Sequence, residues 1–394
     1  MVGGNQYIKS SRNVILKKDK TKKPEWAPEA DNDAFAGRII SGRGGEGADH
    51  PEGSASLHPK VRRKTLGSEA YVAGILNGDR AVLGRAITLI ESNAEAHIIQ
   101  AQEVLRAVLP HSGGTIRVGI TGVPGAGKST LIEALGMHLL ELGHRVAVLA
   151  VDPSSSISGG SILGDKTRME KLSRHPGSFI RPSPSGGALG GVARKTRETM
   201  LLCEAAGFDV ILVETVGVGQ SEIAVRSMVD FFLLLQITGG GDELQGIKKG
   251  VMELADAVVV NKADGENRAP AESARQDFAM ALRYLPAATE GWKTPVRTCS
   301  ALSGEGIGEI WKIICEFREA TVKAGRFELR RRRQAREWML SLIGDYLEHL
   351  FYQHPDIIAQ MPDIEQAVMS GKLPPTTAAR QLLQIFEEAL KSDR

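Results

Sequence analysis

A glycine-rich segment in the first half of the chain has the residue types and spacing needed to hold phosphate. Gly122-Val-Pro-Gly-Ala-Gly-Lys128-Ser129 matches the pattern G-x4-G-K-[ST]. Its glycines let successive backbone N–H groups curl around phosphate oxygens. Lys128 brings a positive charge to the β- and γ-phosphates, and the Ser129 hydroxyl is a ligand for Mg²⁺. The predicted phosphate contacts are Gly122, Pro124, Gly125, Ala126, Gly127, Lys128, Ser129 and Thr130.

Three acidic residues lie at or near the ends of predicted strands, and each is a candidate catalytic group. Asp152 follows an apolar run, Glu214 follows another, and Asp165 lies in a Gly-rich loop between them. Ligands bind beyond the carboxyl ends of strands in open α/β sheets, so these carboxylates are expected near the nucleotide. Asp152 also fits a helix start, and any one of the three fits a solvated loop. The candidate magnesium ligands are Ser129, Asp152, Asp165 and Glu214.

Glycine-rich segments on either side of Glu214 are candidates for switches, which change conformation with the bound nucleotide. The backbone N–H of Gly217 can bind a γ-phosphate and release it after hydrolysis, which is the behaviour of a switch. Residues 185–191 and 239–246 are further Gly-rich segments, and a passive loop is the alternative for each.

A second motif predicts which base is bound. Asn261-Lys-Ala-Asp264 follows an apolar run, and the Asp264 carboxylate can accept hydrogen bonds from guanine N1–H and the N2 amino group. Adenine lacks both donors, so such a site can reject it by about 10⁴ or more. Asn261 would tie the loop to its neighbours, the Lys262 stem would cover the base, and a backbone N–H after the next strand would reach O6. The predicted base-binding set is Asn261, Lys262, Asp264, Ser300, Ala301 and Leu302.

The elements that must position these groups alternate along the middle of the chain. Helical patterns separate short buried runs, which predicts a P-loop α/β domain with a mostly parallel sheet covered by helices on both faces. The predicted strands are 116–121, 146–151, 210–213, 232–237, 257–260 and 296–298.

Helices are expected on both sides of this domain. One should begin at Asp79 as its N-cap, and another should span about 94–109. After about residue 320 the pattern is helical again, and Met339, Ile343, Tyr346 and Leu350 share one face, either as core or as a dimer contact. Pro355, Pro362 and Pro374–Pro375 should divide the remainder into short helices. The predicted organisation is a flexible tail (1–65), an N-terminal helical unit (66–110), a GTPase domain (111–320) and a C-terminal helical arm (321–394).

Composition excludes several classes of protein. The 394 residues carry a net charge of only +2, which argues against a nucleic-acid coat, and no apolar run reaches the ~20 residues of a membrane span. Arg330–Arg333 and Arg336 leave nucleic-acid binding as a minor alternative. Three scattered cysteines, Cys203, Cys299 and Cys315, indicate small core residues rather than disulfides or zinc ligands. The scattered cysteines fit a reducing compartment, so a cytoplasmic location is expected, with a mitochondrial transit segment in the tail as the alternative.

Several segments together carry a family resemblance. They are Val151-Asp-Pro-Ser-Ser, Gly160-Ser-Ile-Leu-Gly-Asp-Lys-Thr-Arg-Met169, Arg181-Pro-Ser-Pro184, Glu214-Thr-Val-Gly-Val-Gly-Gln-Ser-Glu222 and Gly240-Gly-Asp-Glu-Leu-Gln-Gly-Ile-Lys248. From about Tyr71 onward the chain resembles the MeaB and methylmalonic-aciduria type A (ArgK-like) GTPases, the G-protein chaperones of methylmalonyl-CoA mutase. The tail is a departure from short bacterial members, whereas mitochondrial members carry an N-terminal extension.

The resemblance implies a function and roles for residues. It implies a homodimer that uses GTP and Mg²⁺ to gate adenosylcobalamin loading onto the mutase and to protect that enzyme from inactivation. It places Lys128 and Ser129 on the phosphates and metal, and Asp152, Asp165 and Glu214 in the magnesium and catalytic region. It makes 214–222 a switch and 239–249 an additional switch that senses the mutase. The coupling candidates in that additional switch are Asp242, Gln245 and Lys248.

Two other functions use a similar loop. A P-loop kinase or ATPase, as older descriptions of ArgK-like proteins have it, would prefer ATP and need an acceptor pocket. A metal-inserting GTPase would need Cys or His ligand clusters, and the spacing of His111, His144 and His175 provides none. The motif ending in Asp264 favours GTP over the first alternative.

Overall fold

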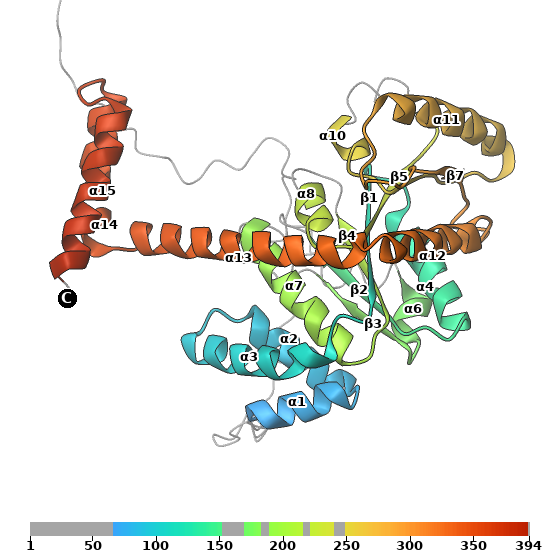
Figure 1. Cartoon of the computed structure of the whole chain (residues 1–394), viewed down its shortest axis with the longest axis horizontal. Coiled ribbons are helices and arrows are strands. Elements are labelled where there is room, and N and C mark those ends of the chain that lie inside the picture. The colour runs from blue at the N-terminus through green and yellow to red at the C-terminus, as the bar shows by residue number, and fades with distance from the viewer. Residues whose placement is uncertain (1–65, 152–168, 183–188, 216–220, 240–248, 393–394) are drawn as a thin grey trace, which may run out of the picture. The chain divides into compact units, whose positions relative to one another are not determined.

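The computed structural model describes residues 66–151, 169–182, 189–215, 221–239 and 249–392 (Figure 1). These residues belong to one compact unit, Lys64–Arg394. No helix among them is long and apolar enough to cross a membrane.

A parallel sheet of seven strands forms the centre of the described residues (Figure 1). The strand order is β3-β2-β4-β1-β5-β6-β7, and every neighbouring pair is parallel. All carboxyl ends therefore lie at one edge, where ligands bind in such sheets. The strands are β1 Ile116–Gly122, β2 Val146–Val151, β3 Ser178–Arg181, β4 Val210–Thr215, β5 Phe231–Gln236, β6 Ala257–Val260 and β7 Val296–Thr298.

The predicted α/β class is confirmed, and two details of the strands differ from expectation. Strand β3 has only four residues at the edge of the sheet and gives too short an apolar run to be recognised. Glu214 and Thr215 belong to β4 itself, because they pair with Ala150 and Val151 of β2. Glu214 is therefore held by a central strand rather than by the loop that follows it.

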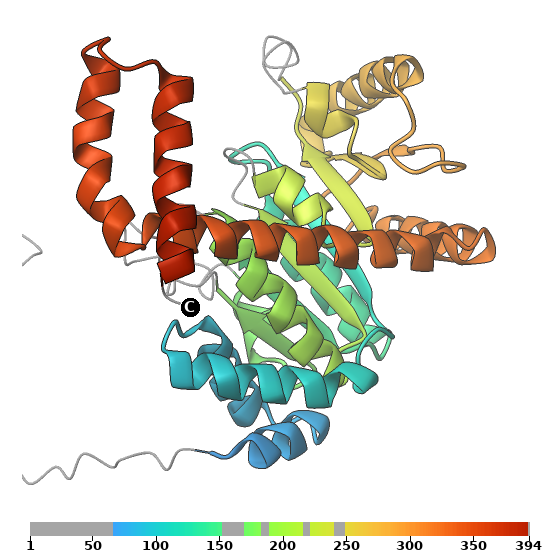
Figure 2. The ribbon, with the colours of Figure 1, turned by 60° about the vertical axis from the view of Figure 1, so that its left-hand side comes forward.

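Helices cover both faces of the sheet, and α14 and α15 lie apart from it at the end of α13 (Figures 1 and 2). They are α1 Ser68–Leu76, α2 Arg80–Glu91, α3 Glu95–Val108, α4 Lys128–Glu141, α6 Glu170–Arg174, α7 Leu189–Ala205, α8 Ser221–Arg226, α10 Lys249–Met252, α11 Arg268–Ala281, α12 Ile307–Lys323, α13 Arg326–Tyr352, α14 Pro355–Met369 and α15 Pro375–Ser392. Short 3-10 turns occur at Leu109–His111, Gly265–Asn267 and Leu282–Tyr284.

Alternate residues of each strand face different helical layers. On β4, Val210 and Leu212 pack with α4 and α12, whereas Ile211 and Val213 pack with α7 and the N-terminal helices. This alternation follows from the two-residue period of a strand. It predicts that Glu214 points toward α4 and that Thr215 points to the opposite face.

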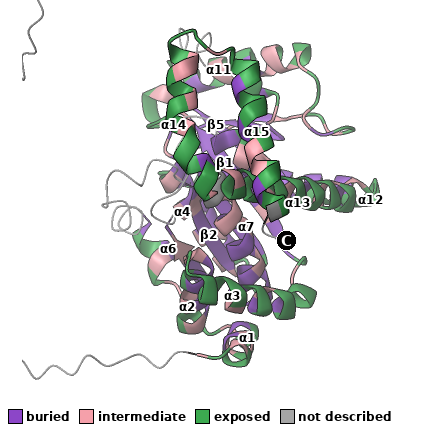
Figure 3. Ribbon diagram, turned by 90° about the vertical axis from the view of Figure 1, so that its left-hand side faces the viewer, coloured by how far each residue is buried: buried purple, intermediate pink, exposed green. Residues whose placement is uncertain are grey.

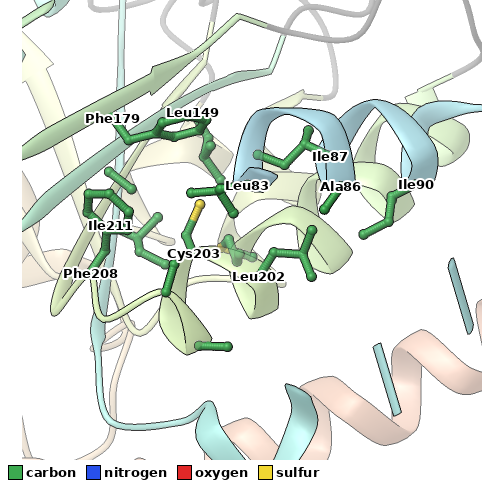
Figure 4. Packing of buried hydrophobic residues seen from close by; sticks show 14 of the residues in the cluster. Leu83, Ala86, Ile87, Ile90, Leu149, Phe179, Leu202, Cys203, Phe208 and Ile211 are labelled. Atoms are coloured by element: carbon green, nitrogen blue, oxygen red, sulfur yellow. The ribbon is translucent and has the colours of Figure 1, made fainter. Parts of the chain in front are cut away.

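The N-terminal helices pack on α7. Figure 4 shows Leu83 and Ile87 of α2 against Cys203 of α7, with Phe208 nearby. The predicted N-cap is confirmed, since the Asp79 carboxylate accepts hydrogen bonds from the backbone N–H groups of the first turn at 2.8 and 3.1 Å. The helix expected over about 94–109 is confirmed as α3. Helix α1 was not predicted, because its nine residues bury only Tyr71 and Ile75.

The C-terminal helices partly differ from expectation. Pro355 and Pro375 begin α14 and α15, as proline does at a first helical turn, but Pro362 lies inside α14, so the expected break there is wrong. Cys315 is exposed, so its prediction as a core residue is also wrong, whereas Cys203 and Cys299 are buried. The four apolar residues predicted to share a face of α13 are exposed. Figure 3 shows the strands of the sheet as mostly buried and the C-terminal helices as mostly exposed.

Candidate nucleotide site

The phosphate-binding segment forms the turn between β1 and α4, and its glycines are required there by geometry. Gly125 and Gly127 have φ angles of +79° and +87°, which side-chain-bearing residues rarely adopt. A Cβ on Gly127 would lie 2.7 Å from Nδ2 of Asn261, and a Cβ on Gly122 would collide with the carbonyl oxygen of Leu235. The loop can therefore pass close to its neighbours only with glycine at these positions.

Lys128 is buried at the first turn of α4. Its ammonium donates hydrogen bonds to the carbonyl oxygens of Gly122 at 3.0 Å and Val123 at 3.3 Å. Burial lowers the pKa of Lys128, and the negative charges of Glu214 and Glu222 oppose this shift. The ammonium is thus poorly solvated, so an anionic phosphate would stabilise its charged form.

Ser129 and Glu214 are brought together at the same edge of the sheet. The Ser129 hydroxyl donates a hydrogen bond of 3.0 Å to Oε1 of Glu214, whose side chain is buried and points toward α4 as the strand alternation requires. A hydroxyl and a carboxylate are hard oxygen donors, so this pair fits the ligands of Mg²⁺. Among the described residues, no three His, Cys, Asp or Glu side chains are grouped to hold a metal ion.

Asn261 connects three loops at the ends of β1, β6 and β7. Its Nδ2 donates a hydrogen bond of 2.8 Å to the carbonyl oxygen of Ala126 in the phosphate loop. Its Oδ1 accepts a 3.0 Å bond from the backbone N–H of Ala301 and a 3.3 Å contact from Sγ of Cys299. One buried amide therefore fixes the phosphate loop relative to both base-binding loops.

The remaining base-binding candidates lie around Asp264. The Ser300 hydroxyl donates a hydrogen bond to Oδ2 of Asp264 and fixes the orientation of that carboxylate. Lys262 is exposed and has a φ of +61°, the only positive φ at a non-glycine residue in the described part of the chain. Leu302 is 85 % exposed, whereas Ala301 is buried.

Two supporting residues had no recognisable signal in the sequence. Nδ2 of Asn267 donates a 2.6 Å hydrogen bond to the carbonyl oxygen of Lys262, and the Thr238 hydroxyl donates to Oδ1 of Asn267 at 2.6 Å. These bonds hold the unusual backbone conformation of Lys262. Asn267 is only 5 residues from Lys262, but Thr238, which orients Asn267, is 29 residues away, so only the fold completes this arrangement.

Several predicted site residues fall outside the described ranges. They are Asp152, Asp165, Gly217, Asp242, Gln245 and Lys248.

The sequence of this chain resembles those of known proteins over most of its length. The sequence model of a family described as "Methylmalonyl Co-A mutase-associated GTPase MeaB" matches residues 83–356. GTPase ArgK of Escherichia coli is 50 % identical over 311 residues, covering 79 % of this chain and 94 % of that protein. The mitochondrial "Methylmalonic aciduria type A homolog" of Mus musculus is 47 % identical over 349 residues, covering 86 % and 83 %.

A solved structure resembles this chain in both sequence and fold. The crystal structure described as "LAO/AO transport system kinase" is 41 % identical, with a TM-score of 0.67, and the match covers 81 % of this chain and 97 % of that one. A phosphate loop, a guanine-type motif and these matches agree, and the chain is a GTPase that belongs to the family of methylmalonyl-CoA mutase-associated GTPases, MeaB.

Proposed function

We propose that this GTPase is a chaperone of an adenosylcobalamin-dependent methylmalonyl-CoA mutase or a related cobalamin-dependent acyl-CoA mutase. It would gate loading of the cofactor and protect the mutase from inactivation. The observation that carries the proposal is the family match over residues 83–356, which include the phosphate and base loops. The name of the mouse relative points to the same metabolic step.

The phosphate loop suggests how GTP is held and hydrolysed. Phosphoryl transfer needs positioning and charge neutralisation more than covalent help. Lys128 would leave its loop carbonyls and neutralise charge on the β- and γ-phosphates, and the N-terminus of α4 would act on the same oxygens. The backbone N–H groups of Gly125, Gly127 and Thr130 would hold the phosphates in place.

Ser129 and Glu214 would hold Mg²⁺, together with Asp152 and Asp165 as sequence-based candidates. The ion, when bound, supplies charge neutralisation at the phosphates. Glu214 serves the protein in a second way, because its carboxylate fixes the Ser129 hydroxyl next to the phosphate loop. One of the three acids would position the attacking water.

Guanine selectivity would come from Asp264. Its carboxylate is oriented by Ser300 and can accept from N1–H and the N2 amino group of guanine. The exposed Lys262 stem and Leu302 would lie along the faces and edge of the base. The backbone N–H of Leu302 would meet O6, because that of Ala301 already donates to Asn261.

The switches and the C-terminal arm complete the proposal. Gly217 would sense the γ-phosphate, and Asp242, Gln245 and Lys248 would couple hydrolysis to the mutase. We also propose that residues 321–394 form a dimerisation arm, with 66–110 as a helical unit beside the GTPase domain (111–320) and 1–65 as a separate tail. A cytoplasmic location follows from this proposal unless the tail directs the chain to mitochondria.

The test is GTP hydrolysis by the purified full-length protein, with and without the methylmalonyl-CoA mutase from the same source, and with ATP as a control. Turnover that is selective for GTP and rises with the mutase supports the chaperone. Turnover that is selective for GTP but indifferent to the mutase overturns the partner and keeps the GTPase. Preference for ATP overturns the role of Asp264 and favours a kinase, as the solved relative is described.

A further inference from the structure

A groove lies between the short helix α8 and the first turns of α13. It encloses about 450 Å³, and α8, the loop 288–290 and α13 provide its walls. Ile223 of α8 and Leu329 of α13 line it and are 64 % and 46 % exposed. A single exposed apolar residue is ordinary, but two that flank one groove give it an apolar rim that a partner can cover.

The groove is more cationic than acidic. Its lining includes four arginines and two glutamates: Arg226, Arg326, Arg330, Arg333, Glu290 and Glu337. Arg226 and Arg330 share the single buried carboxylate of Asp256, and Arg326 pairs with Glu290 at 2.7 Å. Arg333 is exposed and forms no ion pair with any described residue. The charge left for a partner is therefore positive, which fits a segment that offers carboxylates beside an apolar side chain.

The walls of the groove are fixed by hydrogen bonds that join α13 and α7 to the residues directly after α8. Nε2 of Gln334 donates a 2.9 Å bond to the carbonyl oxygen of Val229, which follows α8. Arg197 donates a 2.6 Å bond to the Ser227 hydroxyl and a 3.3 Å bond to the carbonyl oxygen of Gln334. A groove held in this way loses little entropy when a partner binds.

Helix α8 also reaches the nucleotide site. Glu222 is buried, and its charge acts on Lys128 of the phosphate loop. The next residue, Ile223, is exposed and lines the groove. Two adjacent positions on one short helix are therefore buried toward the sheet and exposed in the groove, so a partner that moves Ile223 also moves Glu222.

We propose that the groove between α8 and α13 is the surface through which the mutase stimulates GTP hydrolysis, by inserting an apolar side chain flanked by carboxylates. This inference rests on the mutase partnership under the proposed function and locates the contact with the mutase in the groove. Contact with Ile223 and Arg333 shifts α8, and α8 carries the change to the phosphate loop through Glu222.

The first experiment replaces Ile223 with Asp in the full-length chain and measures GTP turnover over a range of mutase concentrations. We expect basal turnover to stay near that of the wild type and the half-maximal mutase concentration to rise about tenfold or more. Ile99→Asp is the matched control, because Ile99 is 59 % exposed on α3, away from the groove. Wild-type stimulation in Ile223→Asp would overturn the groove as the contact.

The second experiment tests the charge. Arg333→Glu should weaken stimulation, and the neighbouring exposed Arg332→Glu, which does not line the groove, should leave it unchanged. Equal effects of the two variants would contradict a local contact and indicate general attraction. Rising salt should reduce stimulation of the wild type more than that of Arg333→Glu.

Three outcomes separate the proposals. If the wild type itself is not stimulated by the mutase, the partnership fails before the groove is tested, and the groove proposal fails with it. If the wild type is stimulated and both Ile223→Asp and Arg333→Glu behave as the wild type, only the groove fails. If Ile223→Asp changes the mass of the protein in solution, the groove holds a second copy of the chain, and the proposal is again overturned.

Discussion

At the residue scale, the candidate site depends on small groups placed by three loops. Asn261 bonds to Ala126 and Ala301, so the phosphate and base loops keep a common geometry. A buried amide with both ends paired is expensive to replace, because either partner left alone loses a hydrogen bond without gaining water. Gly127 lies directly against this amide, and a Cβ there would lie 2.7 Å from Nδ2 of Asn261.

Asp264→Asn should change the base that is bound. An amide nitrogen facing the N2 amino group of guanine places donor against donor, so GTP affinity should fall by about 10²-fold or more. Xanthine has a carbonyl at that position, so xanthosine triphosphate should bind the variant better than GTP does. Competition of GTP, xanthosine triphosphate and ATP against a fluorescent nucleotide measures this order. Unchanged preference for GTP would contradict the role of Asp264.

Gly127→Ala should abolish tight nucleotide binding. The added Cβ would lie 2.7 Å from Nδ2 of Asn261, and the alanine would have to adopt a φ of +87°. Gly143→Ala is the matched control, because Gly143 has a φ of +88° with open space around it. The control should lose about 1 kcal/mol of stability and keep its affinity for GTP. Calorimetric titration with GTP and thermal unfolding of both variants separate the two effects.

At the element scale, helix ends and helix-to-sheet contacts place the N-terminal helices. The Asp79 cap begins α2, whose buried face packs on α7, and Glu204 of α7 binds the amino end of β1. Local signals begin the helices, and long-range polar contacts decide where they lie.

Asp79→Ala should destabilise the protein by about 1 kcal/mol, because two backbone N–H groups of α2 lose their acceptor. Asp79→Asn keeps an acceptor oxygen and is the control, with a smaller loss. Chemical denaturation monitored by circular dichroism measures both. Equal losses would show that the charge, rather than the cap, is what matters at this position.

Glu204 predicts a loss of stability in acid. Burial alone would raise the pKa of Glu204, but Arg117 and the hydrogen bonds from Arg117, Thr115 and Gly113 hold it below its usual value of 4.5. A carboxyl group whose pKa is lower in the folded state stabilises the protein fully when the pH is above its unfolded-state pKa. This stabilisation is lost as the pH falls through the folded-state pKa.

The matching variant is Glu204→Gln. We expect it to be less stable than the wild type at neutral pH and to lose less further stability between pH 5 and the acid limit. The exposed Glu141→Gln is the control and should follow the wild type. Unfolding curves at a series of pH values measure the difference, and parallel curves for Glu204→Gln and the wild type would refute the role of this ion pair.

At the scale of the whole molecule, α13 changes character along its length. Its first turns are fastened by Arg331, which pairs with Asp230 at 2.7 Å, and by Gln334. Beyond them the apolar side chains are exposed, with fractions of 39–64 % at Met339, Ile343, Tyr346 and Leu350. An apolar stripe on a helix that the chain itself does not cover is typical of a surface that meets another protein.

Ile343→Asp should convert a homodimer into a monomer, because a carboxylate would have to be buried without a partner in the interface. Met280→Asp, at a residue 60 % exposed on α11, is the control and should leave the mass unchanged. Light scattering after size-exclusion chromatography gives the mass directly. A wild-type protein that is already monomeric would overturn the dimerisation arm.

The sequence alone determined the class of fold and its principal motifs. Strand β2 and the phosphate segment were predictable because hydrophobic periodicity and glycine chemistry are local properties, read over a few neighbouring residues. The helix that begins at Asp79 was predictable for the same reason. Edge strand β3 and helix α1 were not, because each is too short to show a period of its own.

Only the tertiary structure decided which of these groups meet. The Glu214 carboxylate contacts Ser129 because β4 extends beyond its apolar run and pairs with β2, and Asn267 holds Lys262 because a short turn returns to it. The burial of Cys299, the exposure of Cys315 and the groove beside Ile223 likewise depend on which elements pack together. Most of these contacts join residues far apart in sequence, and the short-range bond at Lys262 depends on Thr238 from another loop, so no local pattern in the chain specifies them.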